Sequence, residues 1–183
     1  QALIGAQVSV CLVGRNSARL ARVAASTDGA QATVIPMDLR RAEAAQEIAG
    51  RIERDFGRLS LLIHSAGTMA LDTMANASIE DFDQQFAVNL RAPYLLTKAV
   101  LPMLARAKGD IVFVNSSVLR FPRADAGQYA ASKGALLALA DSVRAEVNAE
   151  GVRVLSVFPG STATPMQQRR YESEGRREEY APE

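Results

Sequence analysis

The chain has 183 residues, of which 48% are apolar and 22% charged, and its charges nearly cancel to a formal net charge of +1. This size suits one domain with a substantial core, and the charge balance gives no reason to expect nucleic acid or an anionic membrane as partner. No apolar stretch approaches the ~20 residues of a membrane span, and the first residues do not resemble a signal peptide. We therefore predict a cytoplasmic protein.

The single cysteine, Cys11, lies in an apolar run and is predicted to be a buried structural thiol. One cysteine cannot form an intramolecular disulfide, so the composition favours a reducing compartment. We predict no metal site.

Apolar, β-branched runs alternate with longer helical patterns along the chain. In chain order we expect a strand at 8–13, a helix at 17–26, a strand at 32–36, a helix at 42–56, a strand at 59–64, a helix at 79–107, a strand at 111–115, a helix at 126–150 and a strand at 152–158. The strands are almost continuously apolar, which is typical of strands covered on both faces. This order predicts an α/β fold with a parallel sheet wound by helices on both faces.

The chemically distinctive residues follow the expected strands directly. In chain order these clusters are Gly14-Arg15-Asn16, Met37-Asp38-Leu39, His64-Ser65-Ala66-Gly67, Ser116-Ser117 and Pro159-Gly160. In open α/β sheets, ligands bind beyond the carboxyl ends of the strands. Five such loops at one edge of one sheet predict a site for an elongated ligand.

Tyr129 and Lys133 stand four residues apart near the start of the last expected helix, so their side chains share a face. An ordinary tyrosine pKa of about 10 is too high for easy proton exchange, and a nearby ammonium lowers it. The pair is therefore a candidate acid/base device. Ser117, at the end of a strand, could hydrogen-bond the same substrate oxygen. The alternative is that Ser116 and Ser117 only end the strand and bond local backbone.

Several of these motifs together resemble the short-chain dehydrogenase/reductase family. They are, in the family's order, the segments 64–67 (His-Ser-Ala-Gly) and 88–90 (Val-Asn-Leu), then Ser117, 129–133 (Tyr-Ala-Ala-Ser-Lys) and 159–160 (Pro-Gly). The resemblance runs from residue 1 to about 166 and weakens in the charged tail. It implies a Rossmann-like, doubly wound parallel sheet in three α/β/α layers, and a nicotinamide-dependent oxidoreductase of the compact single-domain branch.

The resemblance implies catalytic roles for four residues. Tyr129 would protonate a carbonyl oxygen, Lys133 would lower the Tyr129 pKa and bind the nicotinamide ribose, and Ser117 would hold the carbonyl oxygen. Asn89 matches an asparagine that supports a water-mediated proton relay; its alternative is a helical polar residue satisfied by backbone. We prefer Ser117 for its strand-Ser-Ser-Val pattern, although the family's more usual spacing from the tyrosine would select Ser116.

The resemblance also implies the residues that bind the cofactor. Ala66 and Gly67 would form a small-residue turn that lets the backbone approach a ligand closely. His64 stands where the family usually has Asn, and we interpret it as a wall of the cofactor pocket rather than a general base. Asp38 and Leu39 match the segment that contacts the adenine ring. The other predicted contacts, besides Tyr129 and Lys133 themselves, are Pro159, Gly160, Thr162 and Thr164.

The choice of cofactor depends on Gly14 and Arg15. An acidic residue at the end of this strand would accept the ribose hydroxyls of NAD and repel the extra phosphate of NADP. Gly14 stands there instead, and the guanidinium of Arg15 suits a phosphate. NADP(H) is therefore favoured, with NAD(H) as the alternative if Arg15 is only a solvated loop charge.

The sequence departs from the family at both ends. The family's first strand with its glycine-rich loop, and its last strand, are missing, so we expect the chain to belong to a longer protein. In the family that first strand lies between the first and third strands seen here. We expect one domain over residues 1–183, with 161–183 as the substrate lid, and a homo-oligomer, either a tetramer or a dimer.

The leading hypothesis is an NADP(H)-dependent carbonyl reductase or alcohol dehydrogenase acting on a small molecule. One rival is a non-catalytic scaffold, against which the complete set of Asn89, Ser117, Tyr129 and Lys133 argues. The other is a sugar-nucleotide epimerase or dehydratase, which fits the compact Pro-Gly pattern less well. Residues 119–121, Gln128 and 166–180 should shape the substrate pocket, but neither the substrate nor the direction of reaction follows from them.

Overall fold

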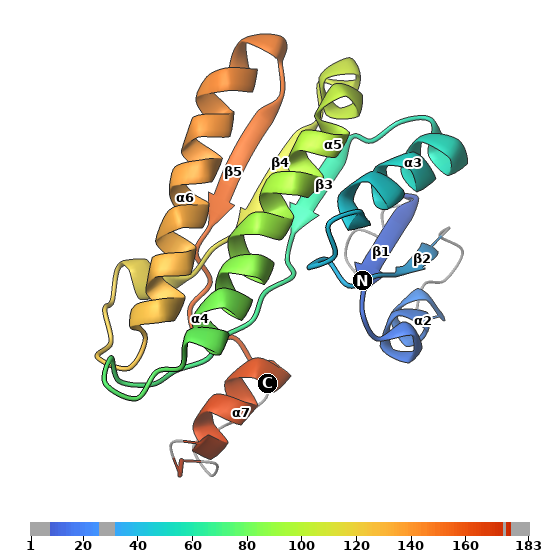
Figure 1. Cartoon of the computed structure of the whole chain (residues 1–183). Helices are drawn as coiled ribbons and strands as arrows, with labels where there is room; N and C mark the ends of the chain where they lie inside the picture. The colour runs from blue at the N-terminus through green and yellow to red at the C-terminus, as the bar shows by residue number, and fades with distance from the viewer. Residues whose placement is uncertain (1–7, 26–31, 174, 177–183) are drawn as a thin grey trace.

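The computed structural model describes residues 8–25, 32–173 and 175–176 (Figure 1). Its strands are β1 (Val10–Gly14), β2 (Ala32–Pro36), β3 (Leu61–His64), β4 (Asp110–Val114) and β5 (Arg153–Val157). Its helices are α2 (Ser17–Ala25), α3 (Ala44–Phe56), α4 (Ile79–Phe86), α5 (Ala92–Ala107), α6 (Gly127–Val147) and α7 (Pro165–Ser173), joined by the π-helical segment η1 (Ala87–Arg91) and the 3-10 turns η2 (Ser117–Leu119) and η3 (Asn148–Glu150). The predicted strands are all present, with ends shifted by one or two residues. Helix α7 lies in the segment that we expected to be a lid.

All strand pairs are parallel, as predicted, but they form two groups instead of one sheet. Strand β1 pairs with β2, and β3, β4 and β5 pair in that order. The division falls between β1 and β3, where the family resemblance places a further strand. The described residues thus form two parallel pieces, and only the order within each piece is fixed by backbone hydrogen bonds.

The single helix predicted over residues 79–107 is instead built from α4, η1 and α5. The hydroxyl of Ser78 caps α4 by accepting a hydrogen bond from the Asp81 amide at 3.1 Å. Pro93, in the first turn of α5, has no amide hydrogen to donate to the carbonyl four residues back, at Asn89. This missing bond fits the π-helical turn at that point, and such turns are common at functional sites.

The core lies between the strands and the helices α3, α5 and α6. Its fully buried members include Ile48 from α3, Leu104 from α5 and Phe113 from β4. Figure 1 shows α5 and α6 against one face of the β3–β4–β5 sheet. On the opposite face Ile63 and Leu155 remain 40% and 46% exposed. Within the described residues, the two faces of this sheet are therefore covered unequally.

Cys11 is partly buried in β1 and packs against the core, rather than being fully buried as predicted. Burial raises the pKa of its thiol above the ordinary value. A raised pKa reduces the thiolate fraction, so the environment is that of a structural cysteine.

The loops after β4 and β5 lie side by side, which brings the distinctive residues of both together. The Asn115 amide donates to the Val157 carbonyl at 2.8 Å, and the Ser117 amide donates to the Pro159 carbonyl at 3.1 Å. Figure 1 shows α7 beyond the carboxyl ends of β4 and β5. The predicted edge for ligand binding is therefore flanked by α6 and α7.

Candidate active site

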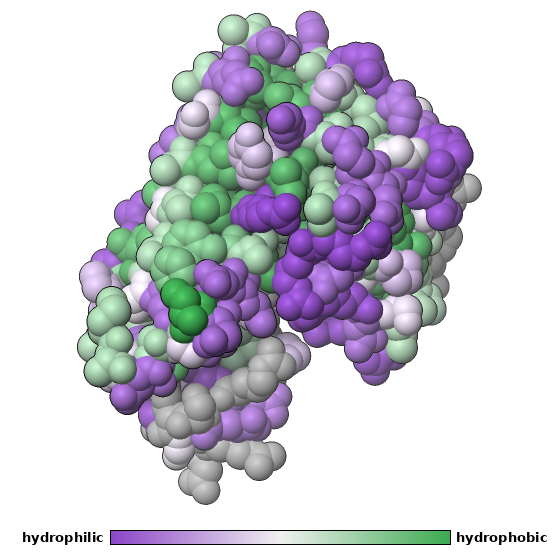
Figure 2. Space-filling model, viewed as in Figure 1, coloured by the Kyte–Doolittle hydropathy of each residue, from purple (hydrophilic) through white to green (hydrophobic). Residues whose placement is uncertain are grey.

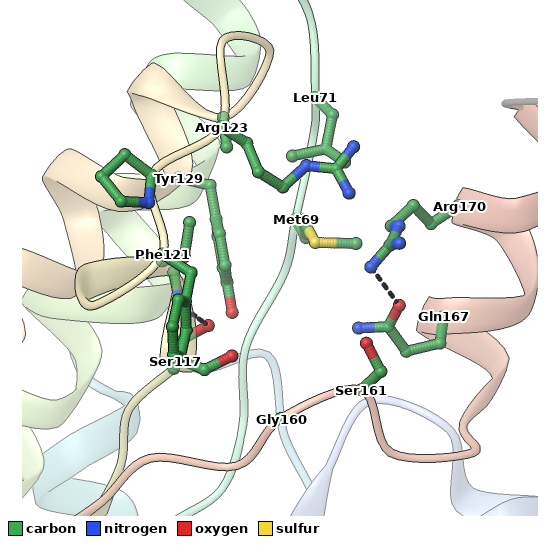
Figure 3. Close-up of a pocket in the computed structure, with 14 residues that line it drawn as sticks. Met69, Leu71, Ser117, Phe121, Arg123, Tyr129, Gly160, Ser161, Gln167 and Arg170 are labelled. Carbon is green, nitrogen blue, oxygen red and sulfur yellow. Dashed lines mark hydrogen bonds between the residues drawn. The ribbon is translucent and has the colours of Figure 1, made fainter.

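Tyr129 lies in the first turn of α6, and its side chain lines a pocket between the loops after β4 and β5 and α7 (Figure 3). The side chain of Ser116 lies close enough to the phenol to act on its pKa. Burial raises the pKa of Tyr129 above its ordinary value, and Ser116 offsets part of that rise. The phenol is therefore protonated at neutral pH and can act as a proton donor.

The serine side chain that acts on the pKa of the Tyr129 phenol is that of Ser116, whereas the sequence pattern favoured Ser117. Ser116 precedes η2 in an extended conformation, and its hydroxyl also accepts a hydrogen bond from the Val118 amide at 3.2 Å. Ser117 begins the 3-10 turn, which turns it in a different direction, although it too lines the pocket. The assignment of the substrate oxygen to Ser117 stays a prediction, with Ser116 as the second candidate.

Lys133 is buried below Tyr129, with only 5% of its surface exposed. Its Nζ donates to the carbonyl of Val114 at 2.9 Å and lies 5.9 Å from the centroid of the Tyr129 ring. Burial lowers the pKa of Lys133 to about 8. The shared helix face was predicted correctly. The expected fall in the Tyr129 pKa is not found, because burial of the phenol outweighs the effects that favour its ionised form.

Asn89 is completely buried in η1 and joins two parts of the site. Its Oδ1 accepts from the Thr68 amide at 2.9 Å, while its Nδ2 donates to the Thr68 carbonyl at 2.9 Å and to the Ser132 hydroxyl at 3.0 Å. Ser132 in turn donates to the carbonyl of Tyr129 at 2.8 Å. Asn89 therefore holds the loop after β3 against α6. Its part in a proton relay stays a prediction.

A second buried amide, which the sequence did not suggest as a site residue, extends this connection. Gln85 is 1% exposed; its Oε1 accepts from the Ala70 amide at 3.2 Å and its Nε2 donates to Gln128 at 3.0 Å. Gln128 donates onward to the Ser78 carbonyl at 3.0 Å. Gln128 thus ties α6 to α4 instead of lining the pocket as predicted. The available signal was the spacing, since Gln85 precedes Asn89 by four residues.

Gly67 lies exposed above Lys133 and Asn89. A Cβ at this position would stand 3.4 Å from Asn89 Oδ1 and 3.8 Å from Lys133 Nζ. The preceding Ala66 is also exposed. The predicted small-residue turn therefore has accessible backbone directly beside the lysine ammonium, as the close approach of a ligand requires.

His64 occupies the core instead of a cofactor pocket. Its ring is 7% exposed, stacks on Phe113 with 4.8 Å between ring centroids, and shares a hydrogen bond of 2.8 Å with the hydroxyl of Thr97. Burial lowers the pKa of His64 to about 3, so the ring is neutral. The interpretation of its side chain as a pocket wall is wrong, because alternate residues of a strand face opposite sides and this one faces α5.

The residues predicted to bind the adenosine part of the cofactor lie at the carboxyl ends of β1 and β2. The Met37 amide donates to the Gly14 carbonyl at 2.8 Å, which holds the two strand ends together. The Asp38 carboxylate forms a bidentate ion pair with Arg40, and the charge of Arg15 adds to it. The Arg40 hydrogen bonds are the main reason that the pKa of Asp38 falls to about 2.

Leu39, also predicted at the adenosine end, packs its side chain against the core. Its side chain is only partly buried there, so its predicted contact with the adenine ring stays a prediction.

The residues after β5 are divided between the pocket and the start of α7. Gly160 lines the pocket beside Tyr129, and the carbonyl of Pro159 bonds the loop after β4. The Thr162 hydroxyl donates to the Gly160 carbonyl at 3.3 Å. The Thr164 hydroxyl accepts from the Gln167 amide at 3.3 Å, which stabilises the first turn of α7.

The pocket encloses about 350 Å³ and has two parts. We call Ser116 and Tyr129, which line the pocket, its floor, together with Lys133 and Asn89, which are buried and do not line the pocket. We call Phe121, Arg123, Gln167 and Arg170 its rim. The wall between them is mainly apolar, with Met69, Leu71, Val118, Pro122 and Ala126. Figure 3 shows Tyr129 and Ser117 on one side of the pocket and Gln167 and Arg170 on the other.

The site and fold agree with a match to a known family. The family model of the short chain dehydrogenases covers residues 1–175. The chain belongs to this family of oxidoreductases, and its Rossmann-like α/β fold with parallel strands is as predicted.

Three relatives illustrate the match. The 2,3-dihydro-2,3-dihydroxybenzoate dehydrogenase of Bacillus subtilis strain 168 is 32% identical over 161 residues, which is 86% of this chain and 62% of that protein. A short chain dehydrogenase of Shigella flexneri 2a, solved in complex with NADP, is 32% identical with a TM-score of 0.85, over 90% of this chain and 72% of that one. An alcohol dehydrogenase from the archaeon Thermococcus sibiricus, complexed with 5-hydroxy-NADP, is 26% identical with a TM-score of 0.85, over 89% and 70%.

The chain spans only 53% to 62% of the length of the first curated relatives it matches. Among the helices of the described residues, none has the length and apolar character needed to cross a membrane. Within the same residues, no three His, Cys, Asp or Glu side chains are grouped so as to hold a metal ion.

Proposed function

We propose that the protein is an NADP(H)-dependent oxidoreductase that interconverts a carbonyl group and a secondary alcohol, with Tyr129 as the general acid/base. The observation that carries this proposal is the phenol of Tyr129, which lines a pocket together with Ser116 and has the ammonium of the buried Lys133 5.9 Å from its ring centroid. A protonated phenol beside a second hydroxyl is suited to bind one substrate oxygen from two sides.

The residues of the chain would divide the work as follows. When bound, the nicotinamide supplies or accepts the hydride. In the direction of reduction Tyr129 donates its proton to the substrate oxygen, and Ser116 donates a hydrogen bond to the same oxygen. The positive charge of Lys133 stabilises the phenolate that remains on Tyr129. Oxidation of an alcohol uses the same groups in reverse.

The residues present fit a nicotinamide dinucleotide. Backbone at Ala66 and Gly67 is exposed next to the Lys133 ammonium, which is placed to bind ribose hydroxyls. Arg15 lies close enough to Asp38 to shift its pKa, so a cation stands at the end of β1, where a 2′-phosphate would be bound. Structurally similar proteins were solved with NADP or 5-hydroxy-NADP and, in one case, with NAD+. The preference for NADP(H) over NAD(H) is therefore proposed on Arg15.

We extend the proposal to the assembly and location of the protein. Figure 2 shows apolar residues gathered over α5 and α6 in the view of Figure 1, and Tyr94 of α5 is 48% exposed. These features support a homo-oligomer, a tetramer or a dimer, that buries this face. We propose a cytoplasmic location, on the composition of the sequence.

The proposal is tested with purified full-length protein and a panel of ketones, by following NADPH oxidation. Tyr129→Phe should lower kcat by about 10²- to 10⁴-fold, the usual contribution of a positioned acid, and leave NADPH affinity within about twofold. Tyr94→Phe is the control, since Tyr94 lies on the outer face of α5. Turnover by Tyr129→Phe at the rate of the control would reject the role of Tyr129. Failure of the wild-type protein to bind NADPH or NADH would favour the non-catalytic alternative.

A further inference from the structure

The rim of the pocket carries two guanidinium groups from distant parts of the chain. Arg123 comes from the loop before α6, and Arg170 comes from α7. Figure 3 shows both side chains reaching toward the space around Met69, with Tyr129 on the opposite side of the view from Arg170. They are the charged side chains among the pocket-lining residues of the described chain, and both are positive.

Each guanidinium is held in place by its neighbours. Arg123 donates from Nε and Nη2 to the two carboxylate oxygens of Asp125, at 3.0 and 2.9 Å. Arg170 donates from Nη1 to Gln167 at 2.9 Å and lies 4.9 Å from the centroid of the Tyr171 ring. Arginine side chains held by such contacts lose less entropy when they bind a further group.

The two guanidinium groups of the rim act on the same carboxylate of the chain. The pKa of Asp125 is lowered mainly by its hydrogen bonds with Arg123, and the charge of Arg170 also lowers it. A carboxylate at this edge of the pocket is therefore within the electrostatic reach of both guanidinium groups. A guanidinium fork matches the geometry of a carboxylate better than that of any neutral group.

We infer that the substrate of this pocket is a carboxylate-bearing oxo acid or hydroxy acid, whose carboxylate is bound by Arg123 and Arg170 at the rim. Its carbonyl or hydroxyl carbon lies at the floor beside Tyr129 and Ser116. The apolar wall between the two ends accommodates the carbon chain or ring that joins them. This inference rests on the proposed function, because it names the substrate class of the same site.

The test compares acids with their methyl esters, which have the same carbon skeleton without the charge. The probes are pyruvate, acetoacetate, 4-oxopentanoate and 4-acetylbenzoate, each with its ester, and the readout is kcat/KM in the full-length protein with NADPH. The wild type should prefer at least one acid over its ester. Arg170→Gln and Arg123→Gln should each lower kcat/KM for that acid by about 10- to 100-fold, as expected for a charge-assisted bond, and change the ester by less than about threefold.

Two matched variants serve as controls for the loss of a surface cation. Arg176→Gln removes a guanidinium that follows α7 and does not line the pocket. Arg120→Gln removes one that lies over the ring of Phe158, 5.4 Å from its centroid, also outside the pocket. Both controls should retain the acid-to-ester ratio of the wild type. Arg170→Lys should recover part of the preference, because it keeps the charge without the fork.

Binding separates this inference from the proposed chemistry. Calorimetric titration of Tyr129→Phe protein, loaded with NADPH, with the same acids and esters reports affinity without turnover. Tighter binding of an acid that disappears in Arg170→Gln supports the rim assignment even if Tyr129 proves not to be the proton donor. Equal affinity for every acid and its ester overturns the inference, even if ketones are reduced. An equal loss for acid and ester in Arg170→Gln also overturns it, since Arg170 would then only hold α7 in place.

Discussion

The floor and the rim of the pocket are built in opposite ways. At the floor, Asn89 and Lys133 are 0% and 5% exposed, and their hydrogen bonds reach residues 19 to 43 positions away in the chain. At the rim, Phe121 is 71% exposed, and two of the hydrogen bonds, from Arg123 to Asp125 and from Arg170 to Gln167, join residues two and three positions apart. The floor is therefore fixed by the fold, whereas the rim is set by short local segments. Substitutions at the floor should therefore change the free energy of unfolding and the rate of turnover. Substitutions at the rim should change which substrates are selected.

The largest effect on the free energy of unfolding is expected at His64, which is buried in the core. Its folded pKa of about 3 lies below its ordinary value of 6.5, so the unfolded chain binds a proton that the folded chain excludes. The contribution of neutral His64 to the free energy of unfolding is fully present above pH 6.5. It is lost as the pH falls toward 3. At about 1.4 kcal/mol per pKa unit, the loss amounts to several kcal/mol.

Urea unfolding of the wild type and of His64→Gln between pH 6.5 and 4.5 measures this pH-dependent loss of stability. His64 is the only histidine, so the window contains no other imidazole. The free energy of unfolding should fall with pH in the wild type and change much less in His64→Gln. Parallel curves for the two proteins would show that His64 is protonated in the folded state.

The next effect concerns Asn89, which holds the loop after β3 against α6. Asn89→Ala leaves the amide and carbonyl of Thr68 and the hydroxyl of Ser132 without these partners. Because an unsatisfied buried polar group costs about 1–3 kcal/mol, the free energy of unfolding should fall by about 3 kcal/mol. Asn76→Ala, at an exposed position before α4, is the matched control and should change stability by less than about 0.5 kcal/mol. A similar result for both variants would contradict the contrast between floor and surface.

The two neighbouring serines provide the third test, within the floor itself. Ser116→Ala should lower kcat by about 10²-fold, as for the loss of one donor to a developing charge. Ser117→Ala should change kcat by no more than a few-fold, because its hydroxyl is not the one that acts on the pKa of the Tyr129 phenol. Steady-state kinetics of the two variants with the same ketone measure the difference. The opposite ranking would restore the preference for Ser117 drawn from the sequence pattern.

The smallest effect is expected at Arg15, an exposed residue far along the site from Tyr129. Arg15→Asp should shift the ratio of kcat/KM for NADPH and NADH toward NADH by about tenfold, because an acid accepts ribose hydroxyls and repels a phosphate. Arg19→Asp makes the same change of charge on α2 and should leave the ratio almost unaltered. An unchanged ratio in both variants would mean that Arg15 does not touch the cofactor phosphate. Stability should be unaffected in either case, as for other exposed positions.

The sequence by itself determined the order and type of most elements and the shared helix face of Tyr129 and Lys133. Apolar runs and helical spacing depend on neighbours within a few residues, so the strands and the shared face of Tyr129 and Lys133 are visible in one dimension. It did not reveal the π-helical turn at Asn89, because the helical pattern continues through it.

Only the tertiary structure decided which side chains meet. It brought both Ser116 and Ser117 to the pocket of Tyr129, and it placed His64 in the core, bonded to Thr97 of α5. It also brought Arg123 and Arg170 to one pocket from segments 47 residues apart. Such contacts join residues that are distant in the chain, and they depend on the packing of whole elements, which local periodicity does not encode.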